Sequence, residues 1–169
     1  TPDEIRSAME RYGALSYQPY CFSQRHDGRY PDPHEIPARS LLAYGTHDMP
    51  PLAAWWSGAD LRLREQLGLD AAEVTARRHH ERTHDRHALL AVLEHNGLRP
   101  PHSSADGPLE PALIDALHAL LARSPAKLLA VQPEDVFGLH GQVNVPGTTE
   151  DRHPNWRLKL PVPLEAWER

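Results

Sequence analysis

Cysteine is almost missing from this sequence, because Cys21 is the single one among 169 residues. One cysteine cannot form an internal disulfide, and such usage is typical of proteins from a reducing compartment. Basic residues are also in short supply, with 18 Lys and Arg against 23 Asp and Glu and a formal net charge of −5. A nucleic-acid-binding face needs surplus positive charge, so the composition argues against that class of partner.

Long apolar stretches are lacking as well. No run approaches the roughly 20 apolar residues that a membrane-spanning helix needs. The chain opens at Thr1 without the charged and then apolar leader of a signal peptide. We therefore expect a cytoplasmic protein without a membrane partner. The 169 residues, 40% of them hydrophobic, suffice for one ordinary domain with a single core.

Hydrophobic periodicity and turn residues predict helices that alternate with strands. The predicted helices begin near residues 3 and 52 and cover residues 60–68, 71–96 and 111–123. The predicted strands cover residues 14–20, 41–45 and 126–131, the last two as buried strands. A stretch rich in Pro, Ser and Gly, residues 98–108, is predicted to be an exposed connection within one domain. This order favours βαβ units, a parallel sheet and the α/β class.

Polar residues lie where the strand predicted at 41–45 ends. His47 and Asp48 follow the apolar run, and Pro50 and Pro51 then prevent further sheet pairing. Barrels of the α/β class place their catalytic groups at the carboxyl ends of strands, just before a helix. This placement favours a functional role for Asp48 over the alternative, in which it caps the next helix.

Four segments carry a resemblance to a known family. Residues 46–52, Thr-His-Asp-Met-Pro-Pro-Leu, precede a Trp pair and resemble a segment of the 4-α-glucanotransferases, the amylomaltases or disproportionating enzymes of glycoside hydrolase family 77. Residues 128–135, 142–148 and 153–160 match further segments in the family's order. Four motifs in one order are far more specific than any one alone. The Met followed by two prolines looks like the bacterial maltodextrin-type branch.

The resemblance implies that residues 1–169 are the C-terminal part of one (β/α)8 (TIM) barrel, with about three strands and their connecting helices. A complete barrel needs about 200 to 250 residues, so this chain is too short to close one. The expected partner is the remainder of the barrel, upstream of Thr1, which carries the nucleophile and the general acid/base. The isolated chain is therefore expected to be inactive.

The resemblance also implies a reaction. Enzymes of this family cleave an α-1,4-glucan and transfer the glucanosyl part, with retention, to the 4-hydroxyl of another glucose or maltooligosaccharide. In this comparison Asp48 corresponds to the third carboxylate, which stabilises the oxocarbenium-like transition state. His47 and Asn144 correspond to residues that contact sugar hydroxyls. No metal and no organic cofactor is implied.

Structural alternatives stay open at several of these positions. His47 could be a buried ring bonded to a backbone carbonyl, and Asn144 could shape the Pro-Gly turn that follows it. The Asn-Trp-Arg segment, residues 155–157, is expected to serve packing and loop closure. Glu134 and Asp135 are expected to complement the start of a helix.

Two other functions compete with the transferase. His80, Glu81 and His84 fit the H-E-x-x-H pattern of zinc metallopeptidases. Charged residues surround this match on every side, whereas a zinc helix at the floor of a cleft needs apolar flanks, so a solvated helix is favoured. The second alternative is a non-catalytic carbohydrate-binding role, in which the chain binds sugar without turnover.

Overall fold

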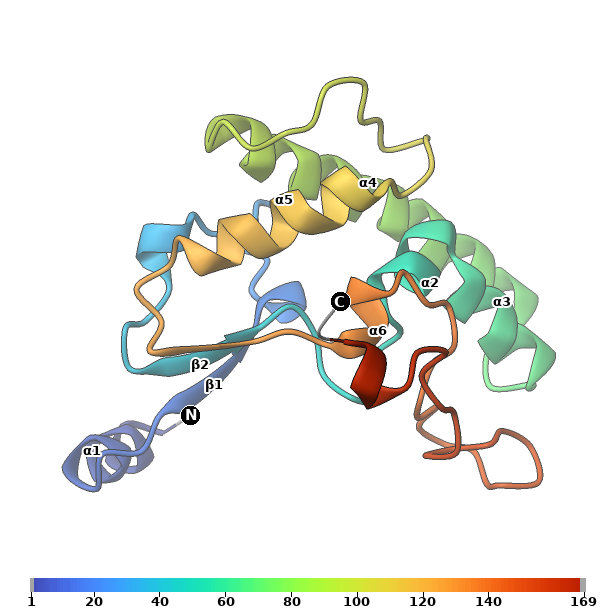
Figure 1. Ribbon diagram of the computed structural model, residues 1–169, viewed down its shortest axis with the longest axis horizontal. Helices are drawn as coiled ribbons and strands as arrows, with labels where there is room; N and C mark the ends of the chain where they lie inside the picture. The colour runs from blue at the N-terminus through green and yellow to red at the C-terminus, as the bar shows by residue number, and fades with distance from the viewer. Residues whose placement is uncertain (1, 168–169) are drawn as a thin grey trace. The chain divides into compact units, whose positions relative to one another are not determined.

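The computed structural model describes residues 2–167, which form a three-stranded parallel sheet and several helices (Figure 1). The strands are β1 (Ser16–Pro19), β2 (Ser40–Ala43) and β3 (Leu128–Ala130). The helices are α1 (Asp3–Arg11), α2 (Leu52–Ser57), α3 (Ala59–Gln66), α4 (Ala72–His95), α5 (Pro111–Ala122) and α6 (Pro133–Val136). Short 3-10 turns lie at Tyr20–Phe22, Pro33–Glu35 and Leu164–Ala166.

The predicted α/β class and the predicted order of elements are confirmed. Each of the three expected strands and five expected helices is present, with bounds that differ by a few residues. Glycines mark helix ends as expected, since Gly13 follows α1 at a φ of 70° and Gly68 follows α3 at a φ of 64°. Closure of the sheet into a (β/α)8 barrel stays a prediction.

The chain divides into two compact units, and each unit draws on two stretches of sequence. One unit comprises the chain up to Thr46 together with His84–Val131. The other comprises His47–Thr83 together with the chain from Gln132 onward. The sheet therefore lies in the first unit, and the loop that carries Asp48 lies in the second.

In the first unit, β2 is the central strand of a sheet with the order β1-β2-β3, and both pairings are parallel. Leu42 of β2 is fully buried. Leu128 and Leu129 of β3 are 51% and 37% exposed, so the prediction of a buried strand at 126–131 is wrong. An apolar run favours a strand that other elements bury, but the run does not say which elements pack against that strand. In this sheet β3 is an edge strand.

Seven leucines of α4 and α5 belong to the apolar core of the first unit. These leucines are at most 3% exposed: Leu89, Leu90, Leu93, Leu113, Leu117, Leu120 and Leu121. The connection at 98–108 is largely exposed as predicted, although Ala105 within it is 2% exposed.

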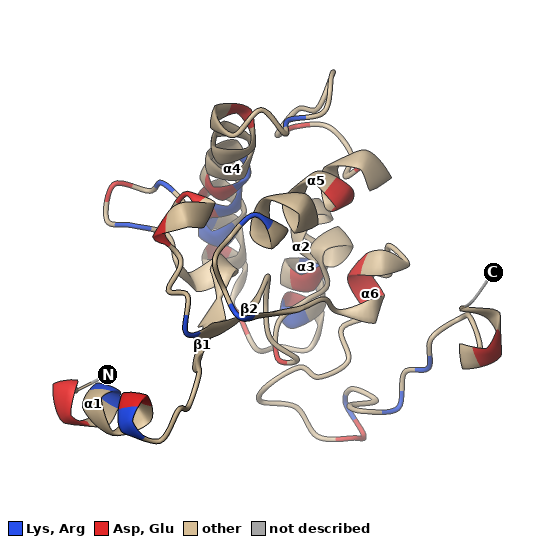
Figure 2. Cartoon of the chain, turned by 60° about the vertical axis from the view of Figure 1, so that its left-hand side comes forward, with Lys and Arg blue, Asp and Glu red and all other residues tan. Residues whose placement is uncertain are grey.

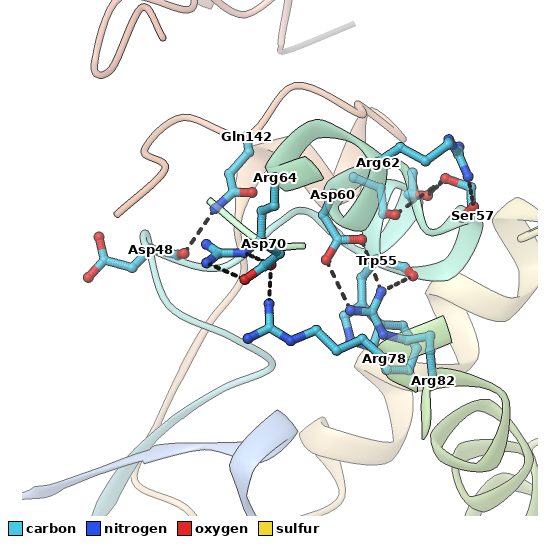
Figure 3. Close-up of polar contacts among 12 residues, drawn as sticks. Asp48, Trp55, Ser57, Asp60, Arg62, Arg64, Asp70, Arg78, Arg82 and Gln142 are labelled. Carbon is cyan, nitrogen blue, oxygen red and sulfur yellow. Dashed lines mark hydrogen bonds and ion pairs between the residues drawn. The ribbon is translucent and has the colours of Figure 1, made fainter. Parts of the chain in front are cut away.

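In the second unit, α2 is buried and α3 and α4 are joined by an ion pair. Leu52, Trp55 and Trp56 have the spacing of one helix face, and they are 0%, 6% and 2% exposed. Arg82 of α4 donates from two nitrogens to the two carboxylate oxygens of Asp60 of α3, both at 3.0 Å (Figure 3). The guanidinium of Arg82 also lies 4.6 Å from the centre of the Trp55 ring.

A second carboxylate of this unit, that of Asp70, binds two arginines. Asp70 precedes α4, and its carboxylate accepts hydrogen bonds from Arg64, at 2.7 Å, and from Arg78 (Figure 3). The hydrogen bond from Arg64 is the main cause that lowers the pKa of Asp70. The ribbon of α4 in Figure 2 carries both red and blue segments, which mark its acidic and basic residues. Within residues 2–167, no helix is long and apolar enough to cross a membrane.

Candidate functional site

The loop between β2 and α2 presents two polar side chains to solvent. The side chains of His47 and Asp48 are 66% and 46% exposed. Pro51 precedes α2 with a φ of −56° and a ψ of 155°, and no side-chain hydrogen bond is made at this N-cap position. The exposure of His47 excludes the alternative of a buried ring. Asp48 lies three residues before the N-cap, so capping of α2 does not explain it either.

The carboxylate of Asp48 meets an amide and an imidazole. Asn144 donates from Nδ2 to Oδ1 of Asp48 at 2.5 Å. Nε2 of His47 lies 3.5 Å from the same Oδ1 atom. The structure thus brings together the three side chains that the sequence singled out, and two of them come from segments 96 residues apart. The side chain of Asn144 contacts Asp48, whereas the hydrogen bond of the Pro-Gly turn joins backbone atoms, from the nitrogen of Thr148 to the oxygen of Val145 at 3.2 Å.

Gln142 fixes the backbone of this site, and sequence reasoning missed it. Its Nε2 donates to the carbonyl oxygen of Asp48 at 3.0 Å (Figure 3). The same Nε2 donates to the carbonyl oxygen of Asn144 at 2.8 Å. A ring nitrogen of His153 lies 2.9 Å from the carbonyl oxygen of Gln142. Gln142 and His153 are 5% and 8% exposed, so these contacts are shielded from water. Gln142 stood inside a matched segment, but no pattern in a polar loop indicates burial.

Asp135 is a second residue whose role the sequence did not indicate. Its Oδ1 accepts a hydrogen bond at 2.6 Å from the backbone nitrogen of Leu52, the first residue of α2. We expected Asp135 to complement the start of its own helix, and it does lie in the first turn of α6, but its carboxylate also binds the start of another helix. Burial raises the pKa of Asp135 to about 6, and the hydrogen bond from Leu52 opposes this shift.

The Asn-Trp-Arg segment combines loop closure with an exposed ring. Asn155 closes the loop as expected, because its Oδ1 accepts from the backbone nitrogen of Val145 at 2.9 Å and its Nδ2 donates to Oγ1 of Thr148 at 2.8 Å. The expectation that Trp156 packs inside is wrong, since it is 61% exposed. Its ring centre lies 5.4 Å from that of His47.

The H-E-x-x-H match lies in the middle of α4. His80, Glu81 and His84 are exposed, and Glu81 pairs with Arg77 one turn earlier at 3.5 Å. No group of three or more His, Cys, Asp or Glu side chains within the described residues is arranged to hold a metal ion. A catalytic zinc requires three protein ligands, so this geometry does not favour the zinc alternative.

The arrangement around Asp48 suits a ligand rich in hydroxyl groups. The carboxylate accepts hydrogen bonds, and the neighbouring amide and imidazole both donate and accept them. Proline residues and the Gln142 contacts limit the movement of the backbone that carries these side chains. Such a fixed negative charge can stabilise positive charge that develops on a bound molecule.

Known proteins are similar to this chain over most of its length. The model of glycoside hydrolase family 77, 4-α-glucanotransferase, matches residues 1–164. A 4-α-glucanotransferase of Haemophilus influenzae is 35% identical over 167 residues, which are 96% of this chain and 24% of that protein. A 4-α-glucanotransferase of Mycobacterium tuberculosis is 42% identical over 123 residues, which are 73% of this chain and 16% of that protein.

A solved structure is also similar. The crystal structure of amylomaltase from Corynebacterium glutamicum superposes with a TM-score of 0.83 at 26% sequence identity, covering 92% of this chain and 23% of that one. The chain spans about a quarter of the length of the Haemophilus influenzae protein. The match of the family model over nearly all of the sequence, together with these relatives, means that the chain belongs to glycoside hydrolase family 77, the 4-α-glucanotransferase family.

Proposed function

We propose that these 169 residues are the C-terminal part of the (β/α)8 catalytic domain of a 4-α-glucanotransferase. Its substrates are α-1,4-glucans and maltooligosaccharides, and its reaction transfers a glucanosyl segment to a 4-hydroxyl with retention. The parallel sheet and the family membership support this assignment. The observation that carries it is the convergence of Asn144 and His47 on the carboxylate of Asp48.

In this proposal Asp48 stabilises the transition state of glycosidic cleavage. The anomeric carbon gains positive charge as the bond to the leaving oxygen breaks, and a fixed carboxylate lowers the energy of that state. The bond from Asn144 to Oδ1 orients the carboxylate. His47 and Asn144 hold hydroxyls of the reacting glucosyl unit. The nucleophile and the general acid/base belong to the part of the family's chain that lies upstream.

The test compares two aspartates in a complete family enzyme that carries these 169 residues. Asp48→Asn should reduce the disproportionation of maltotriose at least about a hundredfold, because an amide cannot supply the negative charge. Asp106→Asn, in the exposed connection at 98–108, is the matched control and should keep the activity. Chromatography for glucose and longer maltodextrins measures both. Full activity of the Asp48 variant would overturn the assigned role.

The chain by itself gives the second arm of this test. We expect no products when it is incubated with maltotriose, since two of the required carboxylates lie outside it. Products from the chain alone would contradict that placement. Sugar binding without turnover in the complete enzyme would favour the carbohydrate-binding alternative. Stoichiometric zinc, with loss of activity in Glu81→Gln, would favour the peptidase alternative.

A further inference from the structure

Trp156 is held in an unusual backbone conformation on the surface of the second unit. Its φ of 62° lies in the left-handed region, which a bulky L-residue rarely adopts. Hydrogen bonds fix this conformation, because the nitrogen of Trp156 donates to the oxygen of Val143 at 2.9 Å and the nitrogen of Arg157 donates to the oxygen of Pro154 at 3.2 Å. Strained residues of this kind cluster at functional sites.

The exposed ring of Trp156 borders the Asp48 site. The ring of His47 lies beside it, with ring centres 5.4 Å apart and planes inclined by 44°. Nε2 of His47 in turn lies 3.5 Å from Oδ1 of Asp48, which accepts the bond from Asn144. An aromatic surface and a group of hydroxyl-binding side chains are therefore adjacent in the same unit.

This combination matches the chemistry of a pyranose ring. A glucosyl unit has flat faces of C–H groups and a rim of hydroxyls, so it needs an apolar surface and hydrogen-bonding groups side by side. A Trp ring supplies a large and rigid apolar face. A carboxylate and an amide supply the acceptors and donors. A purely apolar protein segment would instead bury the charge of Asp48 without compensation, which is unfavourable.

We propose that Trp156 is a stacking platform for a glucosyl ring of the α-1,4-glucan, at the edge of the site formed by Asp48, His47 and Asn144. This inference rests on the proposed function, because it assigns an additional sugar-binding residue to the same site. The strained loop conformation presents the ring outward, where an unstrained backbone would direct it elsewhere. Trp156 binds substrate in the ground state and in the transition state alike.

The test uses Trp156→Gly and Trp156→Phe in the complete family enzyme. Glycine adopts a positive φ without strain, so the first variant removes the ring and leaves the loop conformation intact. We expect it to raise KM for maltoheptaose about tenfold with little change in kcat, as loss of uniform binding does. Phenylalanine retains an aromatic face and should restore most of the affinity. Thermal unfolding of Trp156→Gly should occur at or above the temperature of the unchanged enzyme.

Trp167→Ala is the matched control, because Trp167 is also exposed but contacts Phe137 and not His47. It should leave KM unchanged. A KM within twofold of the original in Trp156→Gly would overturn the platform, and so would an equal rise in the Trp167 variant. Failure of the proposed function has a different signature, namely full activity in Asp48→Asn. The two inferences can therefore fail separately.

Discussion

Two aspartates of the second unit, Asp60 and Asp48, differ in the solvent exposure and in the hydrogen-bond partners of their carboxylates. Asp60 is 6% exposed, and both of its carboxylate oxygens accept hydrogen bonds from the guanidinium of Arg82. The carboxylate of Asp48 is nearly half exposed and contacts an amide and an imidazole. Both aspartates lie close to the N-terminal half of a short helix, so local sequence does not separate them.

The difference teaches which carboxylate can act on a ligand. A buried carboxylate that is matched in charge and geometry by an arginine belongs to the scaffold, and removal of one partner is costly. A carboxylate that is oriented by neutral donors and open to solvent keeps its charge available for a bound molecule. We therefore expect substitutions at Asp60 to affect stability, and substitutions at Asp48 to affect turnover.

The largest effect on stability is expected at the buried pair. Asp60→Asn keeps the size of the side chain but leaves the charge of Arg82 buried without its partner. This should lower the free energy of unfolding by about 3 kcal/mol. Urea denaturation measures the change, and Asp106→Asn, at an exposed site, is the control, with an expected change below about 0.5 kcal/mol. A loss below about 1 kcal/mol at Asp60 would place the pair among ordinary surface ion pairs.

Asp135 shares one property with each of these aspartates. It is buried like Asp60, but its hydrogen-bond donor is a neutral group, the backbone nitrogen of Leu52. Burial raises its pKa from 3.8 to about 6, so the folded state binds the proton more tightly than the unfolded state does. Its contribution to stability is therefore fully present below the unfolded pKa and is lost as pH rises through about 6.

Asp135→Asn should remove this pH dependence, because the amide oxygen still accepts from Leu52 and the side chain cannot ionise. The variant should gain stability relative to the original chain between about pH 4 and pH 7, by roughly 3 kcal/mol or less. Urea unfolding at a series of pH values measures the difference. A stability difference that stays constant across this pH range would show that the pKa of Asp135 is the same in the folded and unfolded states.

Substitution of Gln142 is expected to affect both stability and turnover. Gln142→Ala removes two hydrogen bonds to the carbonyls of Asp48 and Asn144, which should cost about 1 to 3 kcal/mol. In the complete enzyme the carboxylate would lose its alignment, and kcat should fall about tenfold or more. Gln24→Ala is the control, since Gln24 donates to the carbonyl of Gly28 in a loop of the first unit. Equal kcat in both variants would contradict a positioning role.

Much of the fold followed from local signals in the chain. Periodic leucines predicted α5, and the Leu52, Trp55 and Trp56 spacing predicted the buried face of α2, because a helix places such residues on one side. The prediction for β3 identified a strand but not its exposure. Burial of a strand depends on its neighbours in the sheet, and these come from distant parts of the sequence.

The sequence by itself determined the α/β class, the order of the elements, the family and the polar loop with His47 and Asp48. These properties depend on spacing and on motifs, which are local. Only the tertiary structure decided that Gln142 holds the backbone of Asp48, across 94 residues, and that Asp135 binds the start of α2, across 83 residues. Such contacts arise when the chain folds back on itself, and no local pattern of residue types specifies them.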